Sequence, residues 1–400
     1  MAEQLTNEQL LQAANTFGTP LYVYNADKIK IQYNKLTTAF NSNKVKFFYA
    51  CKALTNINIL KVVKDAGCLV DCSSINEVKL ALYAGFVPAN ILYTSNGIGF
   101  EEIEEAQNLG VHINIDSLSN LEKFGQKFGS SYPVGIRLRP GIMAGGHIKI
   151  STGHDKSKFG IPIDQLEAIL SLVNQYDIPI TNLHIHTGSD IKDADVFIKG
   201  IEVLFDIVSY FPHLQSIDLG GGFKVAYKDD DVIIDIDQLA QKVLSAFEAN
   251  ENTRHLEIWF EPGKYIVSEC GYFITSVTVL KETNATTFAS VNSGFNHLIR
   301  PMFYDAYHRI QNISNPEGSI KEYTIVGNIC ETDTFAWNRN LPEIKENDLL
   351  VFYNAGAYGF EMSSNYNSRF KPAEVLFENG VSKLIRKRNV FEDLLRDQLV

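Results

Sequence analysis

The feature that most limits how this chain can fold is a series of eight short apolar runs, rich in β-branched and aromatic residues, that alternate with longer amphipathic stretches. This alternation is typical of βαβ units and a parallel sheet. A closed (β/α)8 barrel uses all eight strands, so we favour it over an open sheet. We expect the strands at 45–50, 68–74, 91–96, 112–116, 134–140, 182–189, 216–222 and 256–263. Two of the amphipathic runs, 75–85 and 195–211, are expected to be helices.

The pattern changes after Pro262. The chain has 400 residues, more than the roughly 200–250 that such a barrel needs. Strand-like runs with little helix between them follow at 272–280, 288–292, 322–328 and 348–358. The sequence therefore predicts an α/β barrel over 28–265 and an all-β domain, a β-sandwich or β-barrel, over 266–400. Residues 1–27 are expected to join the second domain, because a strand-like run at 19–25 precedes the barrel.

Charge and composition exclude several classes of function. The chain has 36 basic and 47 acidic residues, a net charge of −11, which disfavours a nucleic acid or an anionic membrane as a partner. The amino-terminal residues contain neither a basic start nor an apolar stretch typical of a signal peptide or membrane span, so we expect a cytoplasmic protein. The five cysteines lack a C-x2-C pair and are expected to be free thiols, and no metal site is predicted.

In barrels of this kind the chemistry takes place at the carboxyl ends of the strands. The expected strands end in many polar residues and glycines, although any one of them would be weak evidence. These residues are Lys52, Asp71, Ser73, Asn96, Asp116, Arg139, His184, His186, Gly220, Gly221, Gly222 and Glu261. Their convergence on one end of the barrel predicts an active site there.

Lys52 follows an apolar strand, which would place its amine at the rim of the barrel. Desolvation at the rim favours the neutral amine, the form that condenses with an aldehyde. The alternative is a lysine whose stem packs on the barrel while its ammonium reaches solvent. The residue alone does not decide between these two interpretations.

The other candidates have equally plain alternatives. Glycines 220–222 would let backbone N–H groups approach an anion such as phosphate, or would simply form a turn. Glu261 could keep a pyridine nitrogen protonated, or cap the next turn. His186 could lie against a flat ring, or satisfy a hydrogen bond in the core.

Four motifs of the barrel resemble the alanine racemase-like, fold type III family of pyridoxal-phosphate decarboxylases. They are YACKAL (49–54), HIHTGSD (184–190), DLGGGF (218–223) and EPGK (261–264). Three motifs after the barrel are similar to the diaminopimelate decarboxylases of that family. They are HLIRPMFYDAYH (297–308), GNICETDTF (327–335) and AGAYGFEMSSNYNSR (355–369). The resemblance covers nearly the whole chain in the right order.

The resemblance implies a role for each barrel residue. Lys52 would hold pyridoxal 5′-phosphate covalently, His186 would stack on its ring, and Glu261 would pair with the pyridine nitrogen. Asp71 would lie beside the cofactor. The phosphate would be held by Ser189, Gly220, Gly221, Gly222, Gly263 and Tyr358.

The resemblance also implies that the second domain completes the site across a homodimer interface, where Cys330 of the partner subunit would donate a proton. The implied reaction converts meso-2,6-diaminopimelate to L-lysine and CO2, the last step of lysine biosynthesis. Beyond its reacting centre this substrate carries a carboxylate, for which Arg300 has the matching fork geometry, and an ammonium, which Glu331 could pair with. Further substrate contacts are expected from Tyr304, Lys264 and Tyr358.

Two alternatives stay open. The substrate could be ornithine, lysine, arginine or carboxynorspermidine. Ornithine-type decarboxylases, however, typically carry Cys-Asp where this chain has Cys330 and Glu331, and they lack the Arg-Pro pair that begins at Arg300. The chain could also be a cofactor-free regulatory homologue, but such a protein would have no chemical need to keep Lys52, Glu261 and Cys330 together.

Three positions depart from the usual pattern of the family. Lys264 stands where Arg is usual, Asn292 where Asp is usual, and Asp190 where Gln is usual. A lysine in place of an arginine replaces a bidentate contact by a point charge. The departures therefore bear on the contacts of the distal substrate pocket more than on the cofactor chemistry.

Overall fold

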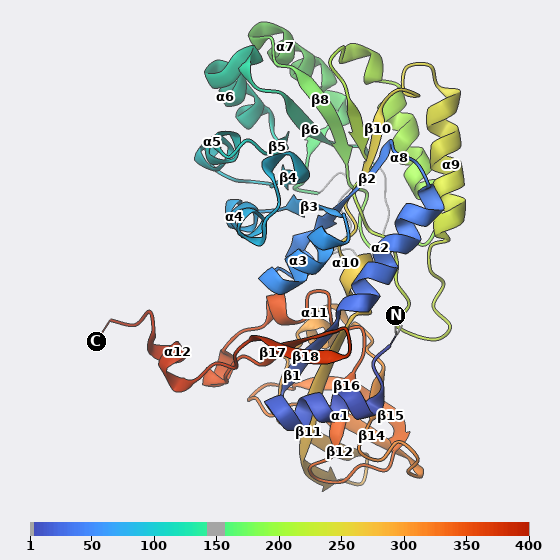
Figure 1. Ribbon diagram of the computed structural model, residues 1–400, viewed down its shortest axis with the longest axis vertical. Helices are drawn as coiled ribbons and strands as arrows, with labels where there is room; N and C mark the ends of the chain where they lie inside the picture. Colours follow the sequence, from blue (N-terminus) through green and yellow to red (C-terminus); the bar gives the residue numbers. More distant parts are fainter. Residues whose placement is uncertain (1–3, 142–156, 400) are drawn as a thin grey trace. The chain divides into compact units, whose positions relative to one another are not determined.

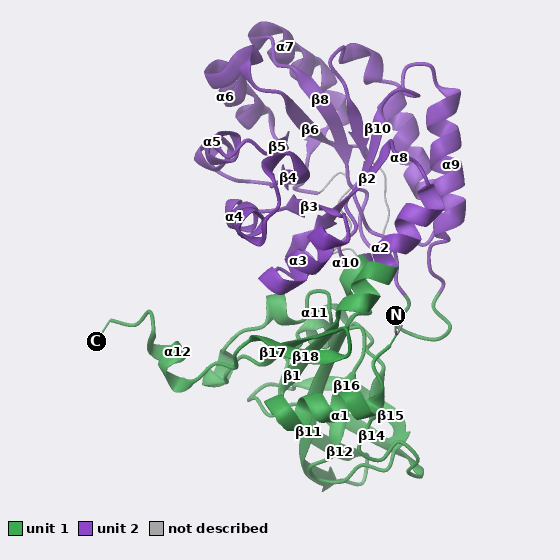
Figure 2. Ribbon diagram, in the orientation of Figure 1, with its two compact units in different colours: residues 1–31, 226–231, 266–400 green, residues 32–225, 232–265 purple. Residues whose placement is uncertain are grey.

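The computed structural model describes residues 4–141 and 157–399 (Figure 1). The chain divides into two compact units (Figure 2). The first unit contains residues 1–31, 226–231 and 266–400, and the second contains residues 32–225 and 232–265. Within the described residues, no helix is both long enough and apolar enough to cross a membrane.

The second unit is a closed parallel barrel. Among the described residues, eight strands follow one another around the barrel, and the pairing of β5 with β6 closes it. The strands are β2 (Val45–Ala50), β3 (Leu69–Cys72), β4 (Ile91–Thr94), β5 (His112–Ile115), β6 (Val134–Arg139), β8 (Ile180–Ile185), β9 (Ser216–Asp218) and β10 (Glu257–Phe260). A short strand, β7 (Ile161–Pro162), also pairs with β6. The predicted barrel and its eight strands are confirmed.

Helices surround the barrel strands on the outside (Figure 1). They are α2 (Ala26–Phe40), α3 (Ile57–Asp65), α4 (Ile75–Ala84), α5 (Phe100–Asn108), α6 (Leu118–Phe128), α7 (Leu166–Tyr176), α8 (Asp195–Phe205) and α9 (Ile236–Ala249). Side-chain caps start several of them: Ser74, Ser117 and Asp235 each accept a hydrogen bond from the backbone N–H three residues later.

Two predicted elements of the barrel end earlier than expected. The helix predicted over 195–211 stops at the end of α8 and continues as a 3-10 turn, Val208–Tyr210. Pro212 follows and disfavours helical backbone at the residue before it. Strand β9 stops at Asp218, so the three glycines that were predicted to end it lie in the following loop. This loop, and not the sheet, therefore determines where the glycine N–H groups point.

Hydrogen-bonded polar side chains cross the inside of the barrel. Ser216 donates to Asn182 (Oγ to Oδ1, 2.8 Å), and Asn182 donates to Asn114 (Nδ2 to Oδ1, 2.9 Å). Asn114 in turn donates to Thr94 (Nδ2 to Oγ1, 3.0 Å). A Cβ on Gly135 would lie 2.0 Å from Asn114 Oδ1, so a glycine is required there. The interior is therefore polar before the strands reach their carboxyl ends.

The first unit is built on a mixed sheet. Among the described residues it has nine strands, and the main path runs β15-β14-β12-β11-β1-β17-β18, with β16 pairing to β11 and β13. The strands are β1 (Leu21–Asn25), β11 (Gly271–Glu282), β12 (Thr287–Val291), β13 (Ile310–Asn312), β14 (Ile320–Val326), β15 (Thr334–Pro342), β16 (Leu349–Phe352), β17 (Ala373–Glu378) and β18 (Val381–Arg386). The amino-terminal strand β1 is central: it pairs antiparallel with β11 and parallel with β17.

Short helices complete this unit. They are α1 (Asn7–Phe17), α10 (Lys264–Val267), α11 (Arg300–Tyr304) and α12 (Phe391–Leu395), and α10 begins in the barrel unit. Thr6 and Gln9 form a capping box at the start of α1. Leu10 and Ala13 of this helix then pack into the core beside Val23 and Tyr272.

The strand predicted over 348–358 is too long. Only Leu349–Phe352 is a strand, because the backbone turns at Asn354, whose φ is +54°. The Asn354 side chain donates a hydrogen bond to Ala226 O (2.6 Å), which holds the turn. Tyr358 therefore lies in a loop, with a φ of +58°, and not at the end of a strand.

Candidate active site

Lys52 is presented by a tight turn at the end of β2. Cys51–Ala53 form one 3-10 turn, closed by a hydrogen bond from Leu54 N to Cys51 O (2.9 Å). Cys51 and Ala53 are buried, whereas Lys52 is exposed. The expected burial of Lys52 is therefore wrong for the single chain. Its charge is nevertheless close enough to the buried carboxyl groups of Asp71 and Glu261 to lower their pKa.

Three buried carboxyl groups lie inside the barrel, on Asp71, Asp218 and Glu261. Burial raises the pKa of Asp71 and of Asp218 well above the usual range, and Glu261 raises both further. Burial alone would also raise the pKa of Glu261, but His184, His186 and Lys52 lower it below its usual range. The surroundings therefore favour the ionised form of Glu261 and disfavour the ionised forms of Asp71 and Asp218.

The surroundings of Glu261 leave one oxygen unsatisfied. Its Oε2 lies 3.4 Å from His184 Nε2, while its Oε1 is buried and has no hydrogen-bond partner among the described residues. Arg137, also buried, is close enough for its charge and that of Glu261 to influence each other's ionisation. A buried anion with an open acceptor suits a cationic N–H donor such as a pyridinium.

The loop after β9 has room only for glycine. A Cβ on Gly221 would lie 2.1 Å from Glu261 O, and one on Gly222 would lie 2.1 Å from Gly188 O. Gly220 and Gly222 also have φ of +67° and +99°, which L side chains rarely adopt. Gly263, at the turn after Glu261, packs against Ala50 with a would-be Cβ 3.1 Å from its Cβ. Such close backbone packing is what a cradle of N–H groups for an anion requires.

His186 is tied to this loop as a neutral ring. Gly221 N donates to His186 Nδ1 (3.2 Å), and burial lowers the pKa of His186 to about 3. Because Nδ1 accepts, the ring proton lies on Nε2. A Cβ on Gly220 would come within 2.6 Å of Nδ1, so the first glycine lets the ring lie against the loop.

Two of the three residues that depart from the family pattern, Lys264 and Asp190, pair with each other. Lys264 Nζ forms an ion pair with Asp190 Oδ1, and the side chains are 12% and 27% exposed. Asp190 has a φ of +61° and follows Ser189, which is half-buried. The third departure, Asn292, is in the other unit: it donates to Thr19 Oγ1 (2.8 Å) and accepts from Ser276 N (3.0 Å).

The remaining predicted residues lie in the first unit. Arg300 and Tyr304 are on α11, and Arg300 is buried with its guanidinium carbon 5.2 Å from the centre of the Tyr227 ring. Its Nε has no hydrogen-bond partner among the described residues. Cys330 and Glu331 are exposed in the loop between β14 and β15, and Tyr358 is half-buried.

The structure thus brings the predicted residues together as two groups, one in each unit. The barrel group contains Lys52, Asp71, His186, Ser189, Gly220, Gly221, Gly222, Glu261, Gly263 and Lys264. The other group contains Arg300, Tyr304, Cys330, Glu331 and Tyr358. Four residues of these groups were not predicted from the sequence: Arg137 and Asp218 inside the barrel, and Tyr366 and Asn367 beside Cys330. Arg137 was detectable, since it lies two residues before Arg139 and so faces the same side of the strand.

One cluster in the described residues has the spacing of metal ligands, namely His184, Asp218 and Glu261, whose ligand atoms lie within 4.8 Å of one another. All three are buried, and Asp218 already accepts a hydrogen bond from Gly220 N (2.9 Å). A carboxyl group with a raised pKa is a poor metal ligand. We therefore assign the cluster to the ring end of a cofactor site and not to a metal.

The barrel group fits pyridoxal phosphate. Glu261 offers an open, buried acceptor for the ring nitrogen, the glycine loop offers a cradle that a Cβ would fill, and Lys52 offers an exposed amine. These features match the three chemical ends of the cofactor: pyridine nitrogen, phosphate and aldehyde.

Comparisons with known proteins agree with this fit. Residues 26–268 match the family model of the pyridoxal-dependent decarboxylase, pyridoxal binding domain. The chain is 37% identical to the diaminopimelate decarboxylase of Methanothermobacter thermautotrophicus, over 98% of this chain and 94% of that protein. It matches the crystal structure of Helicobacter pylori diaminopimelate decarboxylase complexed with L-lysine with a TM-score of 0.89, at 33% identity over 98% of each chain. A lysine/ornithine decarboxylase from Vibrio vulnificus, complexed with putrescine, shares the fold with a TM-score of 0.82 at 23% identity, over 94% of this chain and all of that one.

Proposed function

Because the chain belongs to the diaminopimelate decarboxylase family of pyridoxal-dependent enzymes, we infer that it removes CO2 from meso-2,6-diaminopimelate and releases L-lysine. The protein is therefore a carboxy-lyase of lysine biosynthesis that uses pyridoxal 5′-phosphate. The observation that carries this conclusion is the match to diaminopimelate decarboxylases over nearly the whole length of both chains. The other basic amino acids, from ornithine to carboxynorspermidine, then become comparison substrates.

When bound, pyridoxal phosphate accepts the electron pair that CO2 leaves behind. Lys52 binds the cofactor through Nζ. Glu261, ionised and buried, keeps the proton on the pyridine nitrogen. His186 is neutral and tied to Gly221, so it offers a flat face to the ring without adding a positive charge. Asp71, whose pKa is raised by burial and by Glu261, lies beside the cofactor.

The phosphate is bound at the loop end of the barrel group. The proposed donors are the backbone N–H groups of Gly222 and Gly263, the Ser189 hydroxyl and Tyr358. Gly220 and Gly221 shape the loop, because their own N–H groups already donate to Asp218 Oδ1 and His186 Nδ1. Tight packing fixes the glycine backbone in place, so these donors need no rearrangement to meet an anion.

The distal end of the substrate is recognised by charge. Arg300, supported by the Tyr227 ring, is the proposed partner of the distal carboxylate. Glu331 pairs with the distal ammonium. Lys264, Tyr304 and Tyr358 supply the remaining contacts, and the ion pair with Asp190 holds Lys264 in place.

Cys330 is the proposed proton donor, through Sγ, to the carbon that loses CO2. We propose that it acts on the barrel of a partner subunit in a homodimer, which agrees with its exposure in a loop of the first unit. We also propose that the two units correspond to domains 28–265 and 266–400, with residues 1–27 joining the second, and that the enzyme is cytoplasmic.

The test of this function uses purified protein with pyridoxal phosphate and meso-diaminopimelate. L-lysine and CO2 should form in equal amounts, and borohydride reduction should leave a pyridoxyl group on Lys52 by mass spectrometry. Lys52→Ala should lose both the label and the activity, whereas Lys79→Ala, an exposed helical lysine paired with Glu105, should keep both. Turnover of ornithine, lysine or arginine in preference to diaminopimelate would contradict the substrate assignment.

A further inference from the structure

Cys330 and Glu331 are held by two consecutive residues from a distant part of the chain, Tyr366 and Asn367. We propose that Asn367 and Tyr366 are positioning residues, of which Asn367 orients the Cys330 thiol and Tyr366 orients the Glu331 carboxylate. This inference rests on the roles proposed above for Cys330 and Glu331. All four side chains are exposed, so the surrounding core does not fix their positions.

Asn367 forms two hydrogen bonds with Cys330. Its Oδ1 accepts a hydrogen bond from Cys330 N (2.9 Å), and its Nδ2 donates one to Cys330 Sγ (3.1 Å). The first bond fixes the backbone of the loop, and the second fixes the direction of the sulfur. A donor aimed at sulfur also favours the negative charge that remains there once the proton has been given away.

Asn367 is well suited to this position because of its backbone. Its φ is +54°, in the left-handed region that Asn, Asp and Gly tolerate better than other residues. This conformation places the amide beside a residue 37 positions earlier in the chain. Asp and Gly can therefore replace Asn367 without adding backbone strain, which makes them clean test variants.

Tyr366 holds the neighbouring carboxylate. Its hydroxyl donates to Glu331 Oε1 (2.7 Å) and lies 3.9 Å from Cys330 Sγ. The hydrogen bond to Glu331 raises the pKa of Tyr366 to about 12, so the hydroxyl remains a donor at neutral pH. The Tyr366 ring stacks on Phe295 (centroids 5.7 Å apart, planes at 24°), and Asp333 Oδ1 accepts a bond from Phe295 N (2.7 Å).

The two residues should therefore affect different kinetic constants. A misdirected thiol slows proton delivery, which lowers kcat. A misdirected Glu331 carboxylate weakens the ion pair with the distal ammonium of the substrate, which raises KM. A general disturbance of this loop would change both constants together, whichever residue is replaced.

The first experiment measures the rate at which iodoacetamide alkylates Cys330 in the holoenzyme, with the modified cysteine identified by mass spectrometry. All five cysteines lie in the described residues, and the other four are buried. Asn367→Asp keeps the acceptor for Cys330 N but replaces the N–H donor with an oxygen that repels a thiolate. It should slow alkylation at pH 8 by at least about fivefold, since the thiolate is the reacting form. Alkylation at the wild-type rate would overturn the role of Asn367.

The matched control is Asn379→Asp. Asn379 is exposed in the turn between β17 and β18, with a similar φ of +52°, so the same change should leave alkylation unaltered. Asn367→Gly keeps the backbone conformation but removes both bonds, and it should lower kcat with KM unchanged. An unchanged kcat in Asn367→Gly would also overturn the role of Asn367.

The second experiment is steady-state kinetics of Tyr366→Phe with diaminopimelate. KM should rise by about fivefold to tenfold while kcat and the alkylation of Cys330 stay within about twofold. An unchanged KM would overturn the role of Tyr366. Alkylation needs no turnover, so it decides the role of Asn367 even if the wild-type enzyme fails to process diaminopimelate, which would count against the proposed function alone.

Discussion

The two groups of proposed site residues are built in different ways. In the barrel, Asp71, His184, Asp218 and Glu261 are buried. Strand pairing fixes the first three, so that Asp218 lies opposite His184 on the neighbouring strand, and Glu261 follows β10 directly. In the other unit, Cys330, Glu331, Tyr366 and Asn367 are exposed and lie in loops or a short turn. The barrel group is thus preorganised by the fold, whereas the exposed group depends on hydrogen bonds between its own members.

This difference agrees with two separate roles, cofactor binding by the barrel group and proton delivery by the exposed group. Holding a pyridinium requires a buried anion, which only a folded interior can stabilise. Delivering a proton requires a thiol that can meet a substrate bound elsewhere, which an exposed loop allows. The contrast therefore supports the proposal that the exposed group of one subunit serves the barrel of another.

The largest expected effect tests whether the buried anion is essential. Glu261→Gln keeps the shape but removes the charge, and it should lower kcat by about 10²-fold or more because the ring nitrogen is no longer held protonated. Glu257→Gln is the matched control: Glu257 begins β10, the strand that Glu261 follows, and pairs with Lys46 (2.7 Å). Initial rates of lysine formation decide, and a Glu261→Gln enzyme with half of the wild-type rate would contradict the account.

A somewhat smaller effect tests the second unit. Arg300→Lys keeps the charge but loses the fork, so kcat/KM for diaminopimelate should fall by about tenfold to 100-fold. Activity on ornithine, which has no distal carboxylate, should not fall. Arg309→Lys serves as the control, because Arg309 is exposed and stacks on Tyr353 (3.9 Å). An unchanged preference for diaminopimelate over ornithine would remove Arg300 from the distal site.

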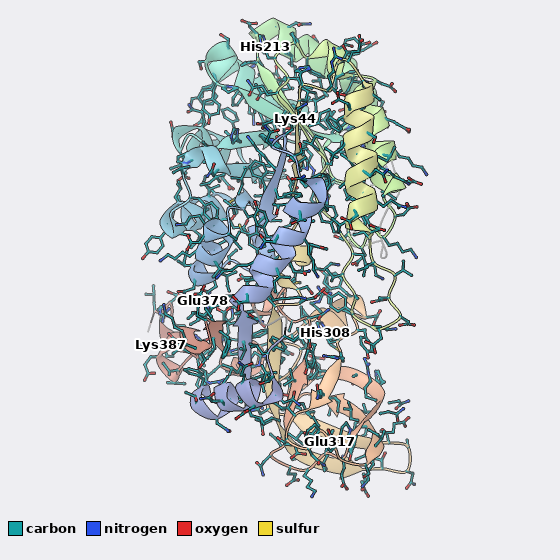
Figure 3. The ribbon with its side chains drawn as sticks, turned by 45° about the vertical axis from the view of Figure 1, so that its right-hand side comes forward. Lys44, His213, His308, Glu317, Glu378 and Lys387 are labelled. Atoms are coloured by element: carbon teal, nitrogen blue, oxygen red, sulfur yellow. The ribbon has the colours of Figure 1, made fainter. Side chains whose placement is uncertain are left out.

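Acid sensitivity compares one histidine with a lowered pKa in each unit. Burial lowers the pKa of His186 in the barrel, and of His308 in the other unit (Figure 3), to about 3 each. An unfolded histidine titrates near 6.5. The unfolded state therefore binds more protons between pH 6.5 and 3, so stability is full above pH 6.5 and falls as the pH drops. The loss is about 1.4 kcal/mol per pH unit and histidine.

His308→Asn should flatten that slope in its own unit. The Asn amide can still donate to Tyr353 O, as His308 Nδ1 does at 2.8 Å. Hydrogen exchange in β13 and β16 between pH 7 and 5 measures the effect, and exposed His213→Asn is the control (Figure 3). If the variant were as acid-sensitive as the wild type, His308 would not be a source of the pH dependence.

The smallest expected effect concerns the ion pair between Lys264 and Asp190. Lys264→Met leaves the Asp190 carboxylate without its partner. Asp190→Asn removes that carboxylate and leaves the Lys264 ammonium without its partner. A double-mutant cycle on the free energy of unfolding should give a coupling of about 1 kcal/mol, since the pair is only partly exposed. Additive effects within about 0.3 kcal/mol would contradict a stabilising interaction between Lys264 and Asp190.

The sequence was most informative where structure is local. All eight barrel strands were predicted, because each is a short apolar run between turn signals. Strands β7, β13, β15, β17 and β18 were missed. β7 and β13 have only two and three residues, and many residues of β15 and β18 are exposed and polar, so none of these four carries a clear apolar pattern. β17 is mostly buried, and its apolar run was overlooked. The strand expected at 348–358 was too long, because apolar composition does not reveal the left-handed turn at Asn354.

The candidate site was also predictable only where its residues lie in continuous motifs. The motifs around Lys52, His186 and Glu261 were recognisable because each is a continuous run of sequence. The contact between Cys330 and Asn367 was not, because it joins residues 37 positions apart and depends on how two loops fold. Arg137 was overlooked because the prediction named only Arg139 from its strand, although strand alternation places Arg137 and Arg139 on the same face.

The most direct test of the division between the two groups is complementation of inactive subunits. Lys52→Ala and Cys330→Ala enzymes, each inactive alone, are mixed in equal amounts and allowed to exchange subunits. If Cys330 serves the partner's barrel, each mixed dimer contains one intact site, and lysine formation should recover to about a quarter of the wild-type rate. If no activity returns although mass spectrometry confirms the mixed dimer, Cys330 does not act across the interface and the account is contradicted.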